Sequence, residues 1–284
     1  MEGMIRKSTF CLAGVIAFVW AMGTSADDLR PDPGYLHDQD YVRHFDAVCG
    51  AGEKLSAGCD AIRARRIVDA AADPWRAIGR VNFASIELRH HCTGTLVSER
   101  VVLTAAHCLY NFPRKQWIPP ESIVFVAGFQ RGAGVAVSRG REFILSSEED
   151  AASRHFHSKP EQDWALLVLE DPIGHEVGFL EVLTSTLSDF ADHKFQLAGY
   201  AGLRPHVLSV AADCGGPQGR TANALLQTCS AMAGDSGAPV LISISGKYLV
   251  AGVFSSIVGY RNGFSSLTVP GSAFIEALKE ESAE

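Results

Sequence analysis

From residue 67 to the C-terminus, short β-prone runs alternate with turns rich in glycine and polar residues. Such a pattern favours many short strands and is typical of all-β sandwiches and barrels. The runs that we predict to be strands cover residues 77–81, 122–128, 143–146, 164–169, 195–200, 240–243 and 248–255. Only residues 272–284 carry apolar side chains at helical spacing. The sequence therefore predicts an all-β fold that ends in a helix.

The composition excludes several other classes of protein. Of the 284 residues, 47% are hydrophobic and 20% are charged, which is enough apolar material for a packed core and excludes a disordered chain. The net charge is −7 and the 25 Lys and Arg residues form no dense run, so we expect no nucleic-acid partner, because phosphate binding needs clustered positive charge. No repeat of solenoid length is visible.

The N-terminus has the pattern of a signal peptide. Two basic residues precede an apolar stretch over residues 10–22, and the small residues Thr24 and Ala26 fit a cleavage site before Asp27. An uncleaved anchor is the alternative. No later stretch is long and apolar enough to span a bilayer, so we expect a secreted or periplasmic mature protein that is not membrane-bound.

The exported chain divides into two parts in this interpretation. Residues 27–66 are polar and turn-rich, and they end in a basic cluster at residues 63–66 that a protease of the secretory route could cut. We interpret this part as a propeptide or N-terminal extension, and residues 67–284 as the main domain.

Export to an oxidising compartment favours disulfides among the six cysteines that remain after the signal. Their spacing leaves many pairings possible, and we predict that neighbours in sequence pair. The predicted bridges are Cys49–Cys59, Cys92–Cys108 and Cys214–Cys229. A zinc site is the competing interpretation, but the chain has no CxxC or HExxH motif to support it.

Three segments carry candidate catalytic residues. The first ends in Thr-Ala-Ala-His107-Cys108, the second places Asp163 at the head of an apolar strand, and the third is Gly-Asp-Ser236-Gly-Ala-Pro. Each has a structural explanation when taken alone. Together, in the order His, Asp, Ser in an exported all-β chain, they indicate nucleophilic catalysis, because a serine hydroxyl needs a neighbouring imidazole to remove its proton.

These motifs resemble those of trypsin/chymotrypsin-type serine peptidases. Within that group, the chain most resembles bacterial secreted trypsin-like and glutamyl-endopeptidase-like members. The resemblance covers about three quarters of the chain, from residue 67 onward. It implies two antiparallel six-stranded β-barrels, at about residues 67–175 and 176–284, with the active site between them. It also implies a secreted, monomeric serine endopeptidase that cleaves protein or peptide substrates through an acyl-enzyme and needs no cofactor or metal.

The resemblance assigns a role to each catalytic residue. His107 would act as general base and then as acid, Asp163 would orient the imidazole, and Ser236 would be the nucleophile. The backbone N–H groups of Gly234 and Ser236 would form the oxyanion hole, worth roughly 3–4 kcal/mol per donor. We expect glycine at position 234 because a side chain there would obstruct the substrate carbonyl.

Activation is the next implication of the resemblance. In zymogen-activated relatives, a newly cut N-terminal amine pairs with the acid before the nucleophile, which is Asp235 here. Cleavage after Arg66 by an activating protease would supply that amine from Ile67. The sequence departs from the family pattern at Asp69, where the relatives have glycine. The alternative is that Ile67 merely starts a strand in a constitutively active enzyme.

The resemblance also predicts the specificity pocket. Ser230 would form its floor, where trypsin-like relatives carry an Asp that selects basic residues. Phe254 stands where glutamyl-specific relatives place a His, so glutamate specificity is not supported. With Ile257 as a wall, we expect a preference for small or medium apolar residues before the scissile bond.

Two other functions are weighed against this one. An inactive homologue that serves as a binding module is disfavoured by the intact His107, Asp163 and Ser236. A secreted esterase shares the chemistry, but the Gly-x-Ser-x-Gly motif and chain order of α/β-hydrolases are absent. The remaining histidine pairs, His90-His91 and those at positions 155 and 157, lack further ligands, and we expect them to be exposed loop residues.

Overall fold

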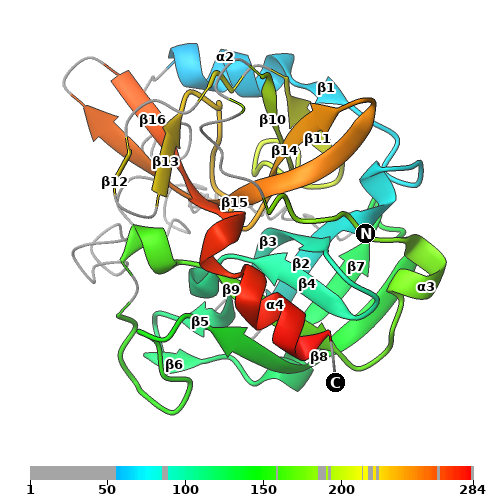
Figure 1. Ribbon diagram of the computed structural model, residues 1–284, viewed down its shortest axis with the longest axis vertical. Coiled ribbons are helices and arrows are strands. Elements are labelled where there is room, and N and C mark those ends of the chain that lie inside the picture. Colours follow the sequence, from blue (N-terminus) through cyan, green and yellow to red (C-terminus); the bar gives the residue numbers. More distant parts are fainter. Residues whose placement is uncertain are drawn as a thin grey trace, which may run out of the picture. The chain divides into compact units, whose positions relative to one another are not determined.

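The computed structural model of the protein describes residues 56–84, 89–157, 159–184, 190, 193–212, 214–216, 220–221, 224–260 and 263–282 (Figure 1). All of them belong to one compact unit of the chain, residues 36–284. The predicted signal peptide, most of the predicted extension and Cys49 lie outside the described residues. None of the described helices is long and apolar enough to cross a membrane.

The first half of the domain is a closed antiparallel barrel of six strands in the order β2-β3-β4-β9-β8-β7. Its strands are β2 (Ile78–Ala84), β3 (Arg89–Leu96), β4 (Val101–Thr104), β7 (Val124–Ala127), β8 (Ala136–Leu145) and β9 (Ala165–Leu169). A separate hairpin is formed by β5 (Tyr110–Asn111) and β6 (Gln116–Trp117). The barrel interior is apolar, and every residue of β4 and β9 is buried.

The register of β4 against β9 places the first two catalytic candidates together. The last residue of β4, Thr104, pairs with the first residue of β9, Ala165. Since the strands are antiparallel, the chain just after β4 and the chain just before β9 lie at the same end of the barrel. His107 and Asp163 occupy those two positions.

The second half is an eight-stranded antiparallel sheet in the order β1-β11-β10-β14-β15-β16-β13-β12. Its strands are β1 (Arg66–Ile67), β10 (Phe195–Gly199), β11 (Ser209–Ala211), β12 (Arg220–Thr221), β13 (Ala224–Gln227), β14 (Pro239–Ile244), β15 (Lys247–Tyr260) and β16 (Gly263–Pro270). It therefore contains the six expected strands in one row, with two-residue strands added at both ends.

Two contacts show that this sheet is rolled. Cys214 follows β11, near one end of the row, and the N–H of Thr228, which follows β13 near the other end, donates to the Cys214 carbonyl at 2.8 Å. The disulfide Cys214–Cys229 joins the same two places. The sheet thus curls back on itself, which agrees with the barrel-like second half that the resemblance implies.

The first strand of the domain belongs to the second sheet. Arg66 pairs with Val210 and Ile67 with Ser209 of β11. The expected boundary, which assigned the chain from residue 67 to the first barrel, therefore differs from the observed pairing. From β1 in the second sheet, the chain crosses to the first barrel before β2.

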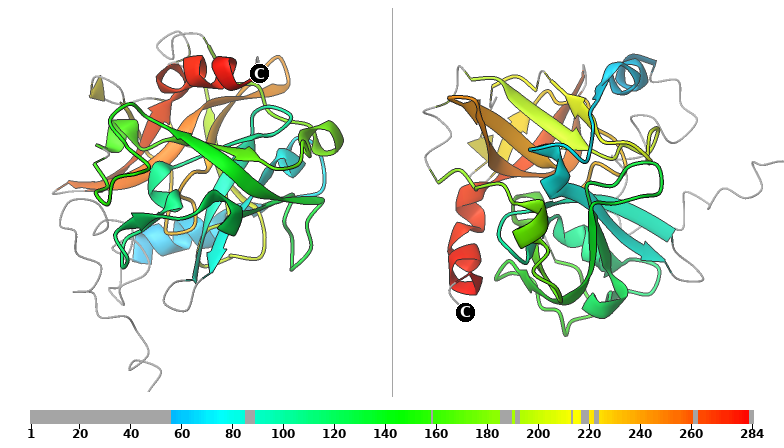
Figure 2. Two further views of the ribbon diagram at one scale, coloured as in Figure 1. Left: turned by 90° about the horizontal axis from the view of Figure 1, so that it is seen from below. Right: turned by 90° about the vertical axis from the view of Figure 1, so that its right-hand side faces the viewer.

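Helices are few in the part of the chain that the structure describes, as expected. They are α2 (Ser56–Ala64), α3 (Gly174–Val177) and α4 (Ile275–Glu281), with short 3-10 helices at Trp75–Ala77, Ala106–Leu109, Pro120–Ser122, Pro160–Gln162 and Gly271–Ala273. The predicted C-terminal helix is confirmed: α4 runs along the outside of the first barrel (Figure 2). Phe274 at its start contacts the ring of Trp164, with centroids 5.9 Å apart.

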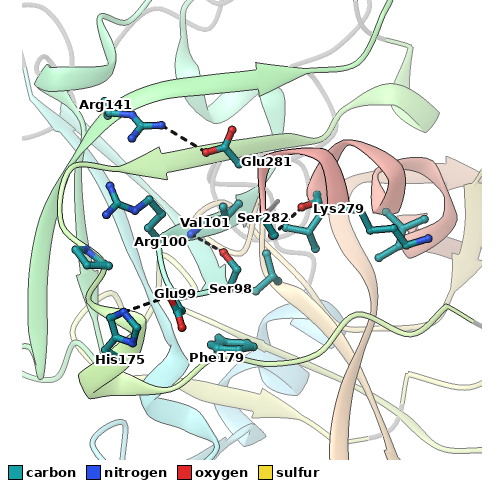
Figure 3. A pocket seen from close by; sticks show the side chains of 14 residues that line it. Ser98, Glu99, Arg100, Val101, Arg141, His175, Phe179, Lys279, Glu281 and Ser282 are labelled. Carbon is teal, nitrogen blue, oxygen red and sulfur yellow. Dashed lines mark hydrogen bonds and ion pairs between the residues drawn. The ribbon is translucent and has the colours of Figure 1, made fainter. Parts of the chain in front are cut away.

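A groove of about 880 Å³ lies between α4 and the first barrel (Figure 3). None of His107, Asp163 and Ser236 lines it. Arg141 lies 3.5 Å from Glu281 of α4, and His175 Nε2 lies 3.2 Å from a carboxylate oxygen of Glu99. The first of these pairs joins α4 to the barrel.

Candidate active site

His107 and Asp163 form a tight, directional pair. His107 lies in the 3-10 helix that follows β4, and its Nδ1 is 2.8 Å from Asp163 Oδ2. The backbone N–H of His107 donates to the other carboxylate oxygen at 2.9 Å. Asp163 is fully buried, whereas the His107 side chain is 13% exposed. The contact assigns the Nδ1 proton to the carboxylate side, so that Nε2 is the basic nitrogen of the neutral ring.

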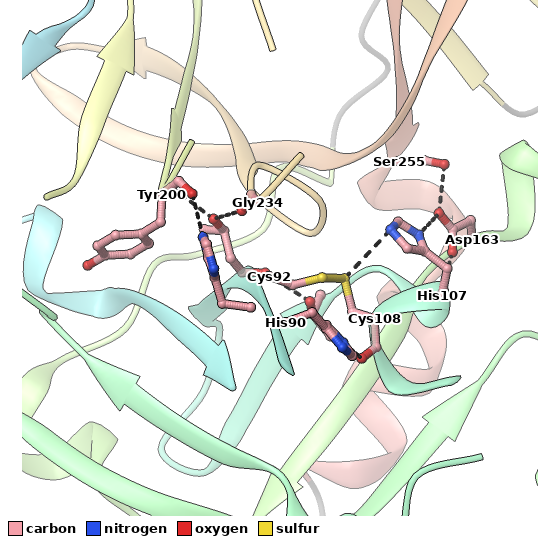
Figure 4. The surroundings of a disulfide bond; sticks show 11 residues. His90, Cys92, His107, Cys108, Asp163, Tyr200, Gly234 and Ser255 are labelled. Carbon is pink, nitrogen blue, oxygen red and sulfur yellow. Dashed lines mark hydrogen bonds and ion pairs between the residues drawn. A yellow bond between two sulfur atoms is a disulfide. The ribbon is translucent and has the colours of Figure 1, made fainter. Parts of the chain in front are cut away.

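A third donor to Asp163 comes from the second sheet. The hydroxyl of Ser255 donates to Asp163 Oδ2 at 2.7 Å, and both side chains are buried (Figure 4). The β15–β16 register shifts between Phe254 and Ser256, so Ser255 lies in a β-bulge. A bulge re-aims a side chain out of the regular alternation of the strand. Sequence reasoning missed Ser255 because its role depends on this local irregularity.

The Cys92–Cys108 disulfide holds the histidine loop to the barrel. Its sulfurs are 2.02 Å apart and it joins β3 to the residue after His107. Figure 4 shows the bridge beside the imidazole, whose Nε2 lies 3.8 Å from the Cys108 sulfur. The structure thus contains two of the three expected bridges, and the third, Cys49–Cys59, stays a prediction because Cys49 lies outside the described residues.

Hydrogen bonds from Thr93 hold the segment of the predicted nucleophile, Ser236, against the first barrel. The N–H of Thr93 in β3 donates to the carbonyl of Ser236 at 2.8 Å, and the Thr93 hydroxyl donates to the carbonyl of Gly234 at 2.8 Å. Gly237 has a φ of +77°, and a Cβ there would collide with the Thr93 carbonyl and lie 2.9 Å from Ala105 N. The glycine after Ser236 therefore permits the close approach of this segment to the chain that leads to His107.

Ser236 lies in this segment with only 5% of its surface exposed. Within the described part of the chain, its hydroxyl makes no hydrogen bond to His107. Such catalytic contacts are often long in the absence of substrate and tighten on binding. The structure therefore brings His107 and Asp163 together directly, while the completed triad stays a prediction.

The segment around Ser236 also leaves two backbone donors available, the N–H groups of Gly234 and Ser236. Its neighbouring N–H groups are engaged: Asp235 donates to the carbonyl of Met232 at 3.0 Å and Gly237 to that of Phe254 at 2.9 Å. Among the described residues, no carbonyl accepts the N–H groups of Gly234 and Ser236. Gly234 has a φ of +94°. A Cβ at this position would collide with the carbonyl of Tyr200, just after β10, and would lie 2.7 Å from Nε2 of His91. Packing therefore requires this glycine, which is a different reason from the one expected.

Comparison with known families settles the class of the chain. The sequence model of the trypsin family matches residues 66–270. The chain belongs to the trypsin family. Membership of this family, together with the fold, makes it a serine endopeptidase.

Several solved structures share the fold. A Glu endopeptidase in complex with MPD has 21% sequence identity and a TM-score of 0.61, covering 78% of this chain and 97% of that one. A thermostable serine protease from an extremophilic microorganism has 18% identity and a TM-score of 0.57, with coverage of 71% and 94%. Protease Anisep from Arthrobacter nicotinovorans has 18% identity and a TM-score of 0.55, with coverage of 73% and 97%.

Asp235, next to the predicted nucleophile Ser236, has an unexpected partner. Both its carboxylate oxygens accept hydrogen bonds of 2.9 Å from the guanidinium of Arg65. The two side chains are buried, with exposures of 1% for Arg65 and 0% for Asp235. The expected partner was the amine of Ile67, but in the intact chain Ile67 lies in β1 with 48% of its surface exposed. Sequence reasoning treated this arginine only as part of a cleavage signal.

The three predicted pocket residues differ in their surroundings. Ser230 is partly buried, and its carbonyl accepts a hydrogen bond from Arg65. Phe254 and Ile257 belong to the core cluster of the second sheet, with exposures of 0% and 3%. Their side chains therefore contribute to the core in this structure, and the specificity assignment stays a prediction.

The first histidine pair lies in a strand and not in an exposed loop as expected. His90 and His91 are partly buried in β3, and their Nε2 atoms lie 3.2 Å from the Cys108 carbonyl and 2.9 Å from the Tyr200 carbonyl, respectively. Loss of solvent on burial lowers the pKa of both imidazoles. His155 and His157 are exposed, as expected.

Proposed function

We propose that this trypsin-family peptidase is exported and hydrolyses peptide bonds through an acyl-enzyme, with His107, Asp163 and Ser236 as its catalytic triad. The observation that carries the proposal is the arrangement around Asp163. Its carboxylate accepts hydrogen bonds from the ring and backbone of His107 and from Ser255. This arrangement holds the imidazole in the tautomer that a general base requires.

The chemistry follows from these positions. As the Ser236 hydroxyl attacks the scissile carbonyl, its proton passes to His107 Nε2, and Asp163 stabilises the imidazolium that forms. The oxyanion accepts hydrogen bonds from the N–H groups of Gly234 and Ser236. Collapse of the tetrahedral intermediate breaks the C–N bond, and His107 returns the proton to the leaving amine. Water then hydrolyses the acyl-enzyme by the same sequence, with His107 as base.

Export is supported by two observations. The described cysteines at positions 92, 108, 214 and 229 form disulfides, which persist in oxidising compartments. The N-terminal pattern of two basic residues, an apolar stretch and small residues is that of a signal peptide. We therefore assign the mature peptidase to the periplasm or the extracellular medium, where it acts as a monomer on protein or peptide substrates.

The proposed substrate preference is for uncharged residues before the scissile bond. Ser230 provides no carboxylate to hold a basic side chain, and Phe254 provides no imidazole for an acidic one. One of the similar structures is a Glu endopeptidase. The Phe254 position is the reason that we do not extend glutamate specificity to this chain. Digestion of a peptide library tests this preference directly.

The test of the catalytic assignment compares the wild type with Ser236→Ala. We expect the wild type to hydrolyse casein and to be labelled by a fluorophosphonate. In the variant, both should fall by several orders of magnitude while the unfolding midpoint stays unchanged, because only the nucleophilic oxygen is lost. A wild type that is labelled and hydrolyses esters, but does not hydrolyse peptides, would favour an esterase. A wild type that is neither labelled nor active would favour a binding module.

A further inference from the structure

The Arg65–Asp235 contact has the geometry of a strong ion pair. The guanidinium approaches the carboxylate with two parallel hydrogen bonds of 2.9 Å. Bidentate pairs of this kind combine charge assistance with a fixed orientation. Burial removes both charges from water, and that cost is offset only where geometry and additional hydrogen bonds are good. Removal of either side chain would therefore leave the other as an uncompensated buried charge.

The pair also braces the segment that carries the proposed oxyanion hole, residues 230–236, which we call the oxyanion loop. Asp235 Oδ2 accepts a further hydrogen bond from the N–H of Met232 at 3.0 Å. On the other side, the Arg65 guanidinium donates to the carbonyl of Ser230. The guanidinium and the carboxylate together hold the loop at its beginning, middle and end.

Arg65 is itself held firmly, although it lies outside the predicted peptidase domain. It stands between α2 and β1, and its carbonyl accepts a hydrogen bond of 3.1 Å from Arg204. One turn earlier, Ile62 is fully buried and clusters with Ala201 and Met232, the latter in the oxyanion loop. The residues just before position 67 are therefore packed as part of the domain and not attached to its surface.

We propose that Arg65 is a built-in positioning residue that shapes the oxyanion loop in the uncut chain, so that the peptidase needs no newly formed N-terminus. This inference rests on the proposed peptidase function. Arg65 supplies the positive charge that cleavage would otherwise supply from the amine of Ile67. The chain up to Arg65 then remains part of the active enzyme and is not a removable propeptide.

The surroundings of the expected cleavage site support the inference. The Arg66–Ile67 bond lies within β1, whose backbone is paired with β11. A protease would have to detach this edge strand to bind it. The new amine of Ile67 would then compete with a guanidinium that already makes two hydrogen bonds to Asp235. Cleavage is therefore expected to give no gain in activity.

Neighbouring arginines provide a matched experiment on the full chain. Arg65 is 1% exposed in its side chain, whereas Arg66 is exposed and lies over the ring of Trp75, 5.8 Å from its centroid. We expect Arg65→Gln to lower kcat by about 100-fold or more, with a smaller change in KM, because misplacing an oxyanion donor costs about this much. Arg65→Lys should recover part of the loss, and Arg66→Gln should stay within about twofold of the wild type.

A second measurement does not depend on the folding of any variant. Folded wild type is labelled with a fluorophosphonate before and after limited trypsin cleavage at Arg66, and the mass of the labelled species is determined. We expect the species labelled before cleavage to retain Arg65, and we expect labelling not to rise on cleavage. Labelling confined to protein that begins at Ile67, a rise in labelling on cleavage, or full activity of Arg65→Gln would overturn the inference. A wild type that is labelled neither before nor after cleavage would instead refute the proposed function.

Discussion

Asp163 and Asp235 are both fully buried carboxylates, yet they have different kinds of partner. Asp163 accepts hydrogen bonds from His107 and Ser255, and Asp235 accepts them from Arg65 and Met232. An imidazole gains and loses a proton near neutral pH, whereas a guanidinium stays charged. The first carboxylate is thus paired with a group that can move a proton, and the second with a permanent charge that suits a purely architectural role.

The largest expected effect tests the first half of this comparison. Asp163→Asn should lower kcat by about 10⁴-fold, because an amide N–H facing Nδ1 forces the ring proton onto Nε2. When both changes are expressed as free energies, the change in the free energy of unfolding should be much smaller than the change in kcat. Hydrolysis of a chromogenic peptide gives kcat, and urea unfolding of the same samples gives the free energy of unfolding.

The matched change at the other carboxylate serves as the contrast. Asp235→Asn leaves the Arg65 guanidinium buried without a counter-charge, so the unfolding free energy should fall by about 3–5 kcal/mol. Comparable loss of stability in the two Asn variants would remove the distinction between the two carboxylates.

A smaller effect is expected at Ser255. Replacing it with Ala removes one donor to a buried carboxylate, which is worth about 1.5–3 kcal/mol. We expect Ser255→Ala to lower stability by that amount and to lower kcat less than Asp163→Asn does. Ser256→Ala, one position along β15, is the control. Equal effects of the two serine variants would show that the bulge does not single out Ser255.

The smallest effect concerns His91, which faces the oxyanion loop. Burial lowers its pKa, although the charge of Asp235 acts in the opposite direction. The unfolded chain, with a pKa near 6.5 for histidine, then binds a proton that the native state does not. The contribution of His91 to stability should therefore be full above about pH 6.5 and fall as the pH drops below this value, by about 1.4 kcal/mol per pH unit at most.

His91→Gln measures this contribution. The amide keeps an N–H donor for the Tyr200 carbonyl but cannot titrate, and His90 remains as a second buried histidine. Urea unfolding at pH 5 and pH 7.5 should show a smaller acid loss in the variant than in the wild type. Identical losses in the variant and the wild type would indicate that the negative charge of Asp235 cancels the effect of burial on the pKa of His91. Arg65 would then not neutralise that charge.

Several mainly apolar strands were predicted closely. Residues 164–169, 195–200 and 240–243 were predicted and match β9, β10 and β14 closely. Only the last part of β8 was predicted, because residues 138–141 are Ser-Arg-Gly-Arg and interrupt its apolar character, and β16, in which Ser and Thr are mixed with apolar residues, was missed. One face of these strands is exposed or polar, so hydrophobic runs do not reveal them.

The site shows a similar division. The motifs identified His107, Asp163 and Ser236, and the β4–β9 register explains why the first two meet. Ser255 and Arg65 could not be found in this way. Arg65 is one of three arginines within residues 63–66, and only tertiary packing distinguishes the buried one from its exposed neighbours.

The ion pair also bears on how the chain folds. Arg65 and Asp235 are 170 residues apart in sequence, and Ser255 reaches Asp163 across 92 residues. Contacts of such long range form slowly, because a large loop must close before they contribute. A partly folded chain in which these contacts have not yet formed would lack the brace on the oxyanion loop. We therefore expect folding intermediates to be proteolytically silent, which protects the chain from self-digestion until its last strands are in place.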